Sequence, residues 1–203
     1  SSSSSQSTVS WDGEYDVIVC GAGIAGIASA ITVAREGNGA SCLLLEKDTT
    51  ANGNSPFCAG SMLYCDDVDK FCVYLKALIG ESTPDDVQRA FAVELKENLN
   101  WLKEIGAKDE WLDVGAPDDS KLGEWPELPN DNTYGRIKFK KDGDGPHHIY
   151  TFLSGLLPDY ADTIDYQTSM PMESLVQDPE NKTILGVVAG GKHYKANKGV
   201  IMC

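Results

Sequence analysis

The chain has 203 residues, of which 41% are hydrophobic and 24% charged, and this composition is typical of a folded globular domain with a sizeable core. Its 31 acidic residues outnumber the 17 Lys and Arg residues and give a formal net charge of -14, so we expect no nucleic-acid partner and no attraction to anionic lipid. No apolar run has the length that crosses a bilayer, so the sequence predicts no membrane span.

Residues 1–13 are predicted to form a flexible tail, because residues 1–10 read SSSSSQSTVS, a polar sequence of low complexity. The stretch lacks the charged and then apolar pattern of a secretion signal. The same stretch would also fit the start of a mature protein whose signal peptide has been removed. The sequence therefore leaves two compartments open, the cytoplasm and, after export, the cell envelope.

A dinucleotide-binding pattern follows in residues 15–26, which read YDVIVCGAGIAG: a short apolar strand, a glycine turn and the start of a helix. Gly21 permits the tight turn, Gly23 leaves room for a pyrophosphate to approach the backbone, and Gly26 lets the helix pack closely on the strand. At the positive end of that helix, the residues expected to meet the phosphates are Ile24 and Ala25.

A second apolar strand, residues 43–45, ends in Glu46, twenty residues after Gly26. We expect the Glu46 carboxylate to accept hydrogen bonds from the ribose hydroxyls, with Lys47 beside it. An acid at this position disfavours a 2'-phosphate, so NADP is the least favoured ligand and FAD or NAD remains.

The loop after Glu46 is rich in small and polar residues, which let a backbone approach a ligand closely. Because it follows the strand that ends at the ribose, we expect it to lie beside the cofactor. The loop residues predicted to bind there are Asn54, Ser55, Ala59, Gly60 and Ser61.

Two amphipathic helices are predicted next. The first covers residues 68–79, and the second has Thr83 as N-cap, starts with Pro84 at the first helical position and is ended by Gly106. We interpret both as scaffold. Residues 107–148 are rich in Asp, Gly and Pro and are expected to be irregular.

Several polar residues of the irregular segment are candidates for a site. His147 and His148 are adjacent and point apart in any regular element, so we favour a surface or loop-anchoring role and predict no metal site. Arg136 is interpreted as solvated or ion-paired.

Six cysteines, at positions 20, 42, 58, 65, 72 and 203, form no CxxC pair, and a disulfide framework is not expected. Cys58, Cys65 and Cys72 recur every seventh residue, which leaves an iron-sulfur or redox site as an alternative. We favour buried thiols instead, because Cys72 falls on the apolar face of a predicted helix.

The last quarter of the chain predicts a helix over 150–157, a strand at 164–166, a three-stranded β-meander over 172–177, 184–189 and 193–196, and a fresh apolar strand over 198–203. The fold class is therefore α/β, a Rossmann-like parallel sheet with helices and a meander. A chain that stops inside an apolar strand is expected to be part of a longer polypeptide.

This order of elements, over most of residues 14–203, resembles the FAD-dependent fumarate reductase and succinate dehydrogenase flavoprotein family, which includes bacterial enoate, urocanate and ketosteroid-type enzymes. The family motifs that wrap the flavin correspond to Asn52-Gly53-Asn54-Ser55 and Ala59-Gly60-Ser61-Met62, in which Asn52 and Ser61 replace glycines. The resemblance implies FAD as cofactor, with the backbone of Met172 at the adenine. It also implies non-covalent attachment, because no His follows the Asn-Ser loop.

By the same resemblance, the expected chemistry is hydride transfer at flavin N5 to or from an activated C=C bond in a small organic acid, enone or steroid-like substrate. The family's catalytic arginine and capping domain lie beyond Cys203, so the remaining C-terminal polypeptide is an expected partner and this piece alone is expected to be inactive. A 3-ketosteroid dehydrogenase, for which Tyr134 is a candidate catalytic residue, is one alternative. An amine or amino-acid oxidase fits less well, and a non-catalytic FAD-binding module is the alternative of another class.

Overall fold

A computed structural model describes residues 9–51, 53–115 and 123–203. The chain divides into two compact units: the first joins the segment that ends at Cys58 to Leu153–Cys203, and the second is Ala59–Phe152. The predicted tail of residues 1–13 falls largely on residues 1–8, which lie outside the described part. Near the end of the predicted tail, the Asp12 amide donates to the His193 carbonyl at 2.8 Å.

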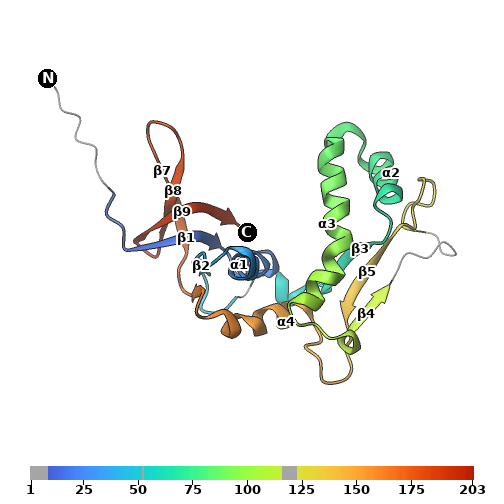
Figure 1. The fold of residues 1–203 in the computed structure, drawn as a ribbon, viewed down its shortest axis with the longest axis horizontal. Helices are drawn as coiled ribbons and strands as arrows, with labels where there is room; N and C mark the ends of the chain where they lie inside the picture. The colour runs from blue at the N-terminus through green and yellow to red at the C-terminus, as the bar shows by residue number, and fades with distance from the viewer. Residues whose placement is uncertain (1–8, 52, 116–122) are drawn as a thin grey trace. The chain divides into compact units, whose positions relative to one another are not determined.

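The first unit is built on a six-stranded sheet in the order β6-β2-β1-β9-β8-β7 (Figure 1). Strands β6, β2, β1 and β9 run parallel, β8 pairs antiparallel with β9, and β7 pairs antiparallel with β8. The strands are β1 (Gly13–Cys20), β2 (Cys42–Leu45), β6 (Ile164–Gln167), β7 (Met172–Gln177), β8 (Ile184–Ala189) and β9 (Lys192–Met202). This arrangement confirms the predicted α/β fold with its parallel sheet and meander.

Strand register brings the carboxyl ends of three parallel strands to one edge of this sheet. Cys20, the last residue of β1, lies opposite Leu45 of β2 on one side and Met202 of β9 on the other. Helix α1 (Ile24–Glu36) starts at the same edge and packs on the sheet through Ile27, Ala30 and Ile31. Central strand side chains such as those of Ile18, Leu43 and Leu44 are fully buried, because both faces of a parallel sheet are covered.

The second unit contains a three-stranded antiparallel sheet, β3-β5-β4, and two amphipathic helices. Its elements are β3 (Ser61–Cys65), α2 (Val68–Ile79), α3 (Asp85–Glu104), β4 (Leu112–Gly115) and β5 (Tyr134–Phe139), while helix α4 (Ile149–Leu156) contains the boundary between the units. The core between α2, α3 and the sheet includes Cys65, Phe71 and Leu95. Single 3-10 turns lie at Ser55–Phe57, Gly80–Ser82, Asp109–Trp111 and Leu157–Tyr160.

Three sequence-based predictions of local structure were wrong. Residues 107–148 are not all irregular, because they contain β4 and β5. These two strands pair with each other, and β5 also pairs with β3, which the sequence placed in a loop. The two last predicted strands are one, β9, which pairs with β1 from Tyr194 to Met202, while Lys192 to Lys195 also pair with β8 on the other side. The N-cap of α3 is Pro84 and not Thr83.

The interpretation of the repeated cysteines as buried thiols is right for Cys65 and wrong for Cys58, which is exposed, while Cys72 is partly exposed. All six are unbridged, Cys42 and Cys65 are buried, and the Cys65 thiol donates to the Ala92 carbonyl at 3.3 Å. The cysteines of the seven-residue repeat therefore lie in different environments, because Cys58 is exposed and Cys65 lies in a packed core.

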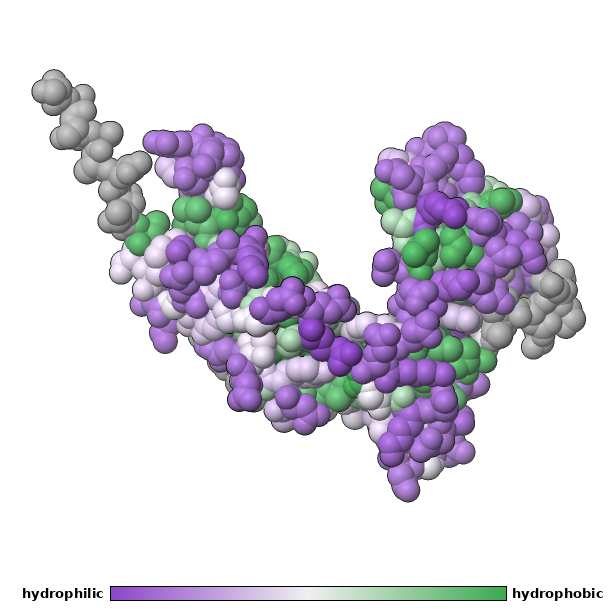
Figure 2. Space-filling view, in the orientation of Figure 1, coloured by the Kyte–Doolittle hydropathy of each residue, from purple (hydrophilic) through white to green (hydrophobic). Residues whose placement is uncertain are grey.

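Hydrophilic residues cover most of the visible face, and hydrophobic residues gather there in small patches (Figure 2). Within the described part of the chain, no helix combines the length and the apolar character that a bilayer crossing requires.

Replacing Gly26 tests the close packing of α1 on β1. A Cβ atom at this position would collide with the carbonyl oxygen of Gly21, a backbone atom that cannot turn away. We expect Gly26→Ala to lower the free energy of unfolding by about 3 kcal/mol, measured by urea denaturation. The matched control is Gly155→Ala in α4, where nothing lies within 4 Å, and a gain of about 0.5 to 1 kcal/mol is expected. Equal losses in both variants would contradict this account.

Candidate functional site

A cavity of about 470 Å³ opens in the first unit at the carboxyl edge of β1, β2 and β9. Its position follows from the fold, because ligands of open parallel sheets bind beyond the carboxyl ends of the strands. The predicted cofactor residues that line it are Gly21, Gly23, Ile24, Ala25, Glu46, Lys47, Asn54, Ser55 and Met172. Gly26 lies just beneath the turn and is buried.

The glycine turn leaves space that any side chain would fill. Gly21 adopts φ +106°, and a Cβ on it would lie 2.7 Å from the carbonyl oxygen of Cys203. A Cβ on Gly23 would lie 3.0 Å from the hydroxyl of Ser55. The bare backbone at these two positions fits the close approach of a pyrophosphate at the start of α1.

Ser55 caps α1 from a distant loop. The N-cap residue of the helix is Gly23, which has no side chain, and the backbone amide of Ile24 donates instead to the Ser55 hydroxyl at 3.0 Å. One of the unpaired amides of the first helical turn is thereby satisfied. This contact fixes the predicted Asn-Ser loop at the mouth of the cavity, whereas Asn52 lies outside the described residues.

Glu46 is buried, with 6% of its surface exposed, and both of its carboxylate oxygens bind backbone amides. Oε2 accepts from the Ala22 amide and Oε1 from the Asp48 amide, each at 3.1 Å. A carboxylate oxygen can accept more than one hydrogen bond, so the predicted bonds to ribose hydroxyls remain compatible with this geometry. Glu46 thus also orders the turn and the loop that form the cavity.

Sequence reasoning missed several residues that line the same cavity, among them Cys20, Met170, Met202 and Cys203. Met170 is held there because its amide donates to the Glu46 carbonyl at 2.8 Å. The signal that could have found them is the rule that carboxyl ends of adjacent parallel strands share one edge. Burial raises the pKa of the Cys20 thiol to about 11, so this group is protonated at neutral pH.

Ala59, Gly60 and Ser61 belong to the second unit and line another cavity, of about 460 Å³, together with cationic side chains of β5. Gly60 has φ +69° and lies against the ring of His148, so a side chain there would be both strained and obstructed. That these residues contact the same cofactor as the glycine turn stays a prediction.

Tyr134 lies in an aromatic cluster of the second unit. Its ring centroid is 5.5 Å from that of Tyr74 and 6.2 Å from that of Phe71, and it lies opposite Cys65 in the register of β3 and β5. This packing by itself accounts for an aromatic residue at the position. A catalytic role for Tyr134 stays a prediction.

The remaining candidates have structural partners. Arg136 is exposed and forms an ion pair with Glu124 at 3.0 Å, which confirms its interpretation as ion-paired. His147 is exposed and its Nε2 lies 2.8 Å from the Gly143 carbonyl oxygen, an anchoring contact within its own loop. Among residues 9–51, 53–115 and 123–203, no group of three metal-ligating side chains is found.

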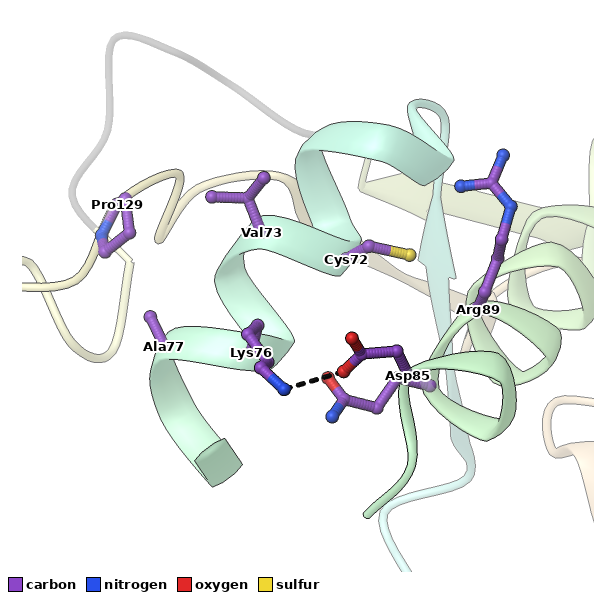
Figure 3. Close-up of a pocket in the computed structure, with 8 residues that line it drawn as sticks. Cys72, Val73, Lys76, Ala77, Asp85, Arg89 and Pro129 are labelled. Carbon is purple, nitrogen blue, oxygen red and sulfur yellow. Dashed lines mark hydrogen bonds and ion pairs between the residues drawn. The ribbon is translucent and has the colours of Figure 1, made fainter. Parts of the chain in front are cut away.

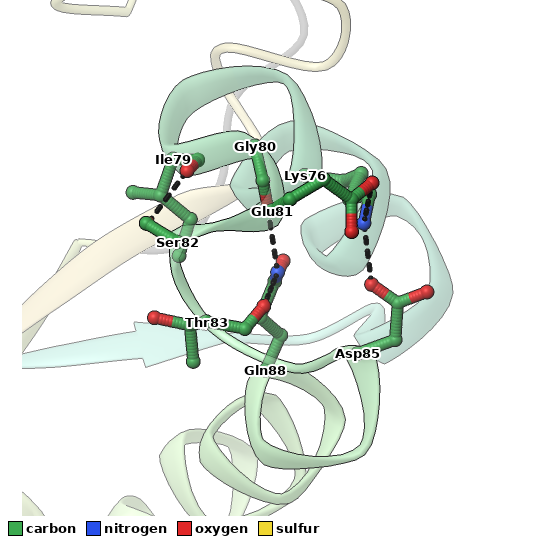
Figure 4. Close-up of polar contacts among 8 residues, drawn as sticks. All are labelled: Lys76, Ile79, Gly80, Glu81, Ser82, Thr83, Asp85 and Gln88. Carbon is green, nitrogen blue, oxygen red and sulfur yellow. Dashed lines mark hydrogen bonds and ion pairs between the residues drawn. The ribbon is translucent and has the colours of Figure 1, made fainter.

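A third cavity, of about 550 Å³, lies beside α2 and α3 and is lined by Cys72, Val73 and Ala77 among others (Figure 3). Gln88, only 4% exposed, donates its amide hydrogens to the carbonyls of Gly80 and Thr83 at 3.2 and 2.7 Å (Figure 4). Lys76 adds ion pairs to Glu81 and Asp85. These contacts fix the turn between the helices, in agreement with the scaffold role expected for them.

Comparison with known families gives one match: residues 16–203 fit the family model of an FAD binding domain. None of the curated proteins matches the chain.

Solved structures with the same fold include the 3-ketosteroid-Δ4-(5α)-dehydrogenase of Rhodococcus jostii RHA1, at 20% identity and TM-score 0.75, with 98% of this chain and 47% of that one covered. The 3-ketosteroid Δ1-dehydrogenase of Sterolibacterium denitrificans gives 17% identity and TM-score 0.75, covering 94% and 47%. A flavocytochrome c3 fumarate reductase has 19% identity and a TM-score of 0.72, with 95% of this chain and 34% of that one covered. The chain thus spans about half the length of the two dehydrogenases, and at these identities the likeness is one of fold.

Replacing Ser55 tests its role as a remote cap of α1. Ser55→Ala removes the acceptor of the Ile24 amide, and we expect the free energy of unfolding to fall by about 1 kcal/mol. Ser29→Ala is the control, because the Ser29 hydroxyl only donates back to the Ala25 carbonyl within α1 and caps nothing. Urea denaturation of both variants measures the difference, and identical midpoints would rule out the cap.

Proposed function

Because the chain belongs to the FAD binding domain family, we propose that it is the FAD-binding portion of a flavin-dependent oxidoreductase that reduces or forms an activated C=C bond. The observation that carries the proposal is the cavity at the glycine turn, where bare backbone, the start of α1 and the buried Glu46 meet. The proposed substrate is a small organic acid, an enone or a steroid-like molecule.

Each part of this cavity has a proposed task in holding the cofactor. Gly21 and Gly23 make room for the pyrophosphate, and the positive end of α1 stabilises its charge. Glu46 takes the ribose hydroxyls, and the backbone at Met172, which lines the cavity, takes the adenine. FAD is held without a covalent bond and, when bound, supplies the site of hydride transfer.

We extend the proposal to the rest of the cofactor and of the protein. The segment Ala59–Ser61 is proposed to contact the flavin ring. Residues 14–203 are proposed to be the N-terminal part of the FAD-binding domain, with the groups that choose and protonate the substrate in a capping domain of the same bacterial protein. The partial coverage of the solved structures supports this division.

A 3-ketosteroid dehydrogenase is the second candidate function. It is favoured by the fold likeness to two ketosteroid dehydrogenases, each with a TM-score of 0.75. Tyr134 would be its candidate catalytic residue, although its contacts in the structure are with Phe71 and Tyr74.

The cofactor proposal predicts a specific effect of neutralising Glu46. In Glu46→Gln the side chain keeps its shape. An NH2 group, which donates hydrogen bonds, replaces one of the two carboxylate oxygens that accept them from backbone amides. We expect FAD affinity to fall by about 1.5 to 3 kcal/mol, measured by quenching of flavin fluorescence in a titration. The exposed Glu36→Gln, at the other end of α1, carries the same charge change and should leave affinity unaltered. Equal FAD affinity in both variants would show that Glu46 does not bind the ribose.

Activity is tested in the longest polypeptide that the gene encodes. With FAD bound, we expect oxidation of reduced viologen in the presence of at least one enoate or enone, or reduction of an artificial acceptor by a 3-ketosteroid. Turnover of the steroid alone would favour the second candidate. FAD binding with no turnover on any of these compounds would favour a non-catalytic FAD-binding module.

A further inference from the structure

The cavity of about 550 Å³ beside α2 and α3 is formed by one face of each helix (Figure 3). Its residues are Cys72, Val73, Lys76 and Ala77 of α2, Asp85, Gln88 and Arg89 of α3, and Pro129 of the loop before β5. Both helical sets follow the i, i+3, i+4 spacing of a single helix face. Phe71 and Leu75, on the opposite face of α2, are buried in the core. The cavity is thus lined by the face of α2 that the core leaves uncovered.

The walls of this cavity are mainly apolar. Val73, Ala77 and Pro129 have side chains of carbon atoms alone, and Val73 is 49% exposed, although valine is usually buried. Apolar surface inside a cavity is stabilised when a ligand removes it from water. The walls therefore favour a ligand that is apolar over most of its surface, and the volume suits a small molecule.

The charged side chains of the lining are held in ion pairs. Lys76 Nζ lies 2.6 Å from a carboxylate oxygen of Glu81 and 2.7 Å from one of Asp85. Arg89 pairs with Asp69 at 2.8 Å. These side chains carry more negative than positive charge, which disfavours an anion, while each carboxylate that could attract a cation is already bound to Lys76 or Arg89. The cavity therefore favours an uncharged ligand.

Gln88 supplies a hydrogen-bond acceptor to this lining. It is only 4% exposed, and its Nε2 donates to the carbonyls of Gly80 and Thr83, so the side of the amide that carries Oε1 is fixed (Figure 4). Within the described part of the chain no donor reaches Oε1, and no fully buried side-chain oxygen there lacks a partner. Oε1 therefore lies at the surface, which at Gln88 is the cavity. An amide oxygen has two lone pairs, so a bond from elsewhere would still leave it able to accept from a ligand.

We propose that this cavity binds a small uncharged molecule, apolar over most of its surface, that donates one N–H or O–H hydrogen bond to Oε1 of Gln88. Small-molecule sites commonly combine apolar walls, which supply most of the affinity, with a few polar groups that orient the ligand. The proposal does not rest on FAD binding or on the flavin chemistry proposed above, because all the lining residues belong to the second unit.

The test is a titration of the chain with indole, followed by ¹H–¹⁵N NMR, and a parallel titration with benzothiophene, which has a similar shape but no N–H. We expect indole to bind saturably and to shift backbone amide signals of α2 and α3. Benzothiophene should bind about five- to tenfold more weakly, which is the usual contribution of one hydrogen bond. The proposal is overturned if indole does not bind saturably, if the shifts lie outside these helices, or if both compounds bind equally.

Ala77→Trp tests the location, because Ala77 is exposed at the lining and a large ring there fills the cavity. We expect indole affinity to fall at least tenfold. Ala90→Trp is the matched control, an exposed position of α3 outside the lining, and should bind indole as the unmodified chain does. Thermal melting shows whether both variants are folded, and equal affinities would contradict the proposal.

The thiol of Cys72 gives a second measurement that needs no variant. Because Cys72 lines the cavity, bound indole should slow its alkylation by iodoacetamide, whereas alkylation of the exposed Cys58 in the first unit should be unchanged. Mass spectrometry of the two peptides measures both rates. An alkylation rate of Cys72 that is the same with and without saturating indole would also overturn the proposal.

Discussion

The buried carboxylate of Glu46 is the contact on which the first unit's cavity depends. Its two oxygens bind the amides of Ala22 and Asp48, and its carbonyl accepts from Met170, so one residue connects the turn after β1, the loop after β2 and the segment that leads into β7. A buried carboxylate without such partners would cost several kcal/mol, on the order of 3 or more. The backbone amides that satisfy it are therefore as important to the site as the acid itself.

Around this contact the cavity is built mainly from backbone. Parallel pairing of β1 with β2 and β9 places three strand ends at one edge, and the turn at Gly21 and Gly23 keeps side chains out of the space between them. The start of α1 adds a positive partial charge, while Ser55 satisfies one of its amides without covering the rest. Such a site recognises phosphate through geometry, with little demand on side-chain identity.

The second unit has a different physical character. Its core is held by aromatic contacts among Phe71, Tyr74 and Tyr134 and by the buried Gln88, which closes the turn between α2 and α3. Its sheet presents lysines on the face away from the core. One cavity of this acidic chain is therefore lined by more cationic than anionic side chains.

Local sequence patterns determined the glycine turn, Glu46, α1 to α3 and the meander, because helix and strand periodicity and turn chemistry act over a few neighbouring residues. Only tertiary structure decided the sheet of β3, β5 and β4, since its strands are separated by long segments and a short strand such as β4 is specified by its partners. Tertiary structure likewise decided that Ser55 lies at the start of α1, that Cys203 lies against Gly21 and that cationic side chains of β5 line one cavity. These contacts join residues far apart in the chain, and no local pattern encodes which distant groups the folded backbone brings together.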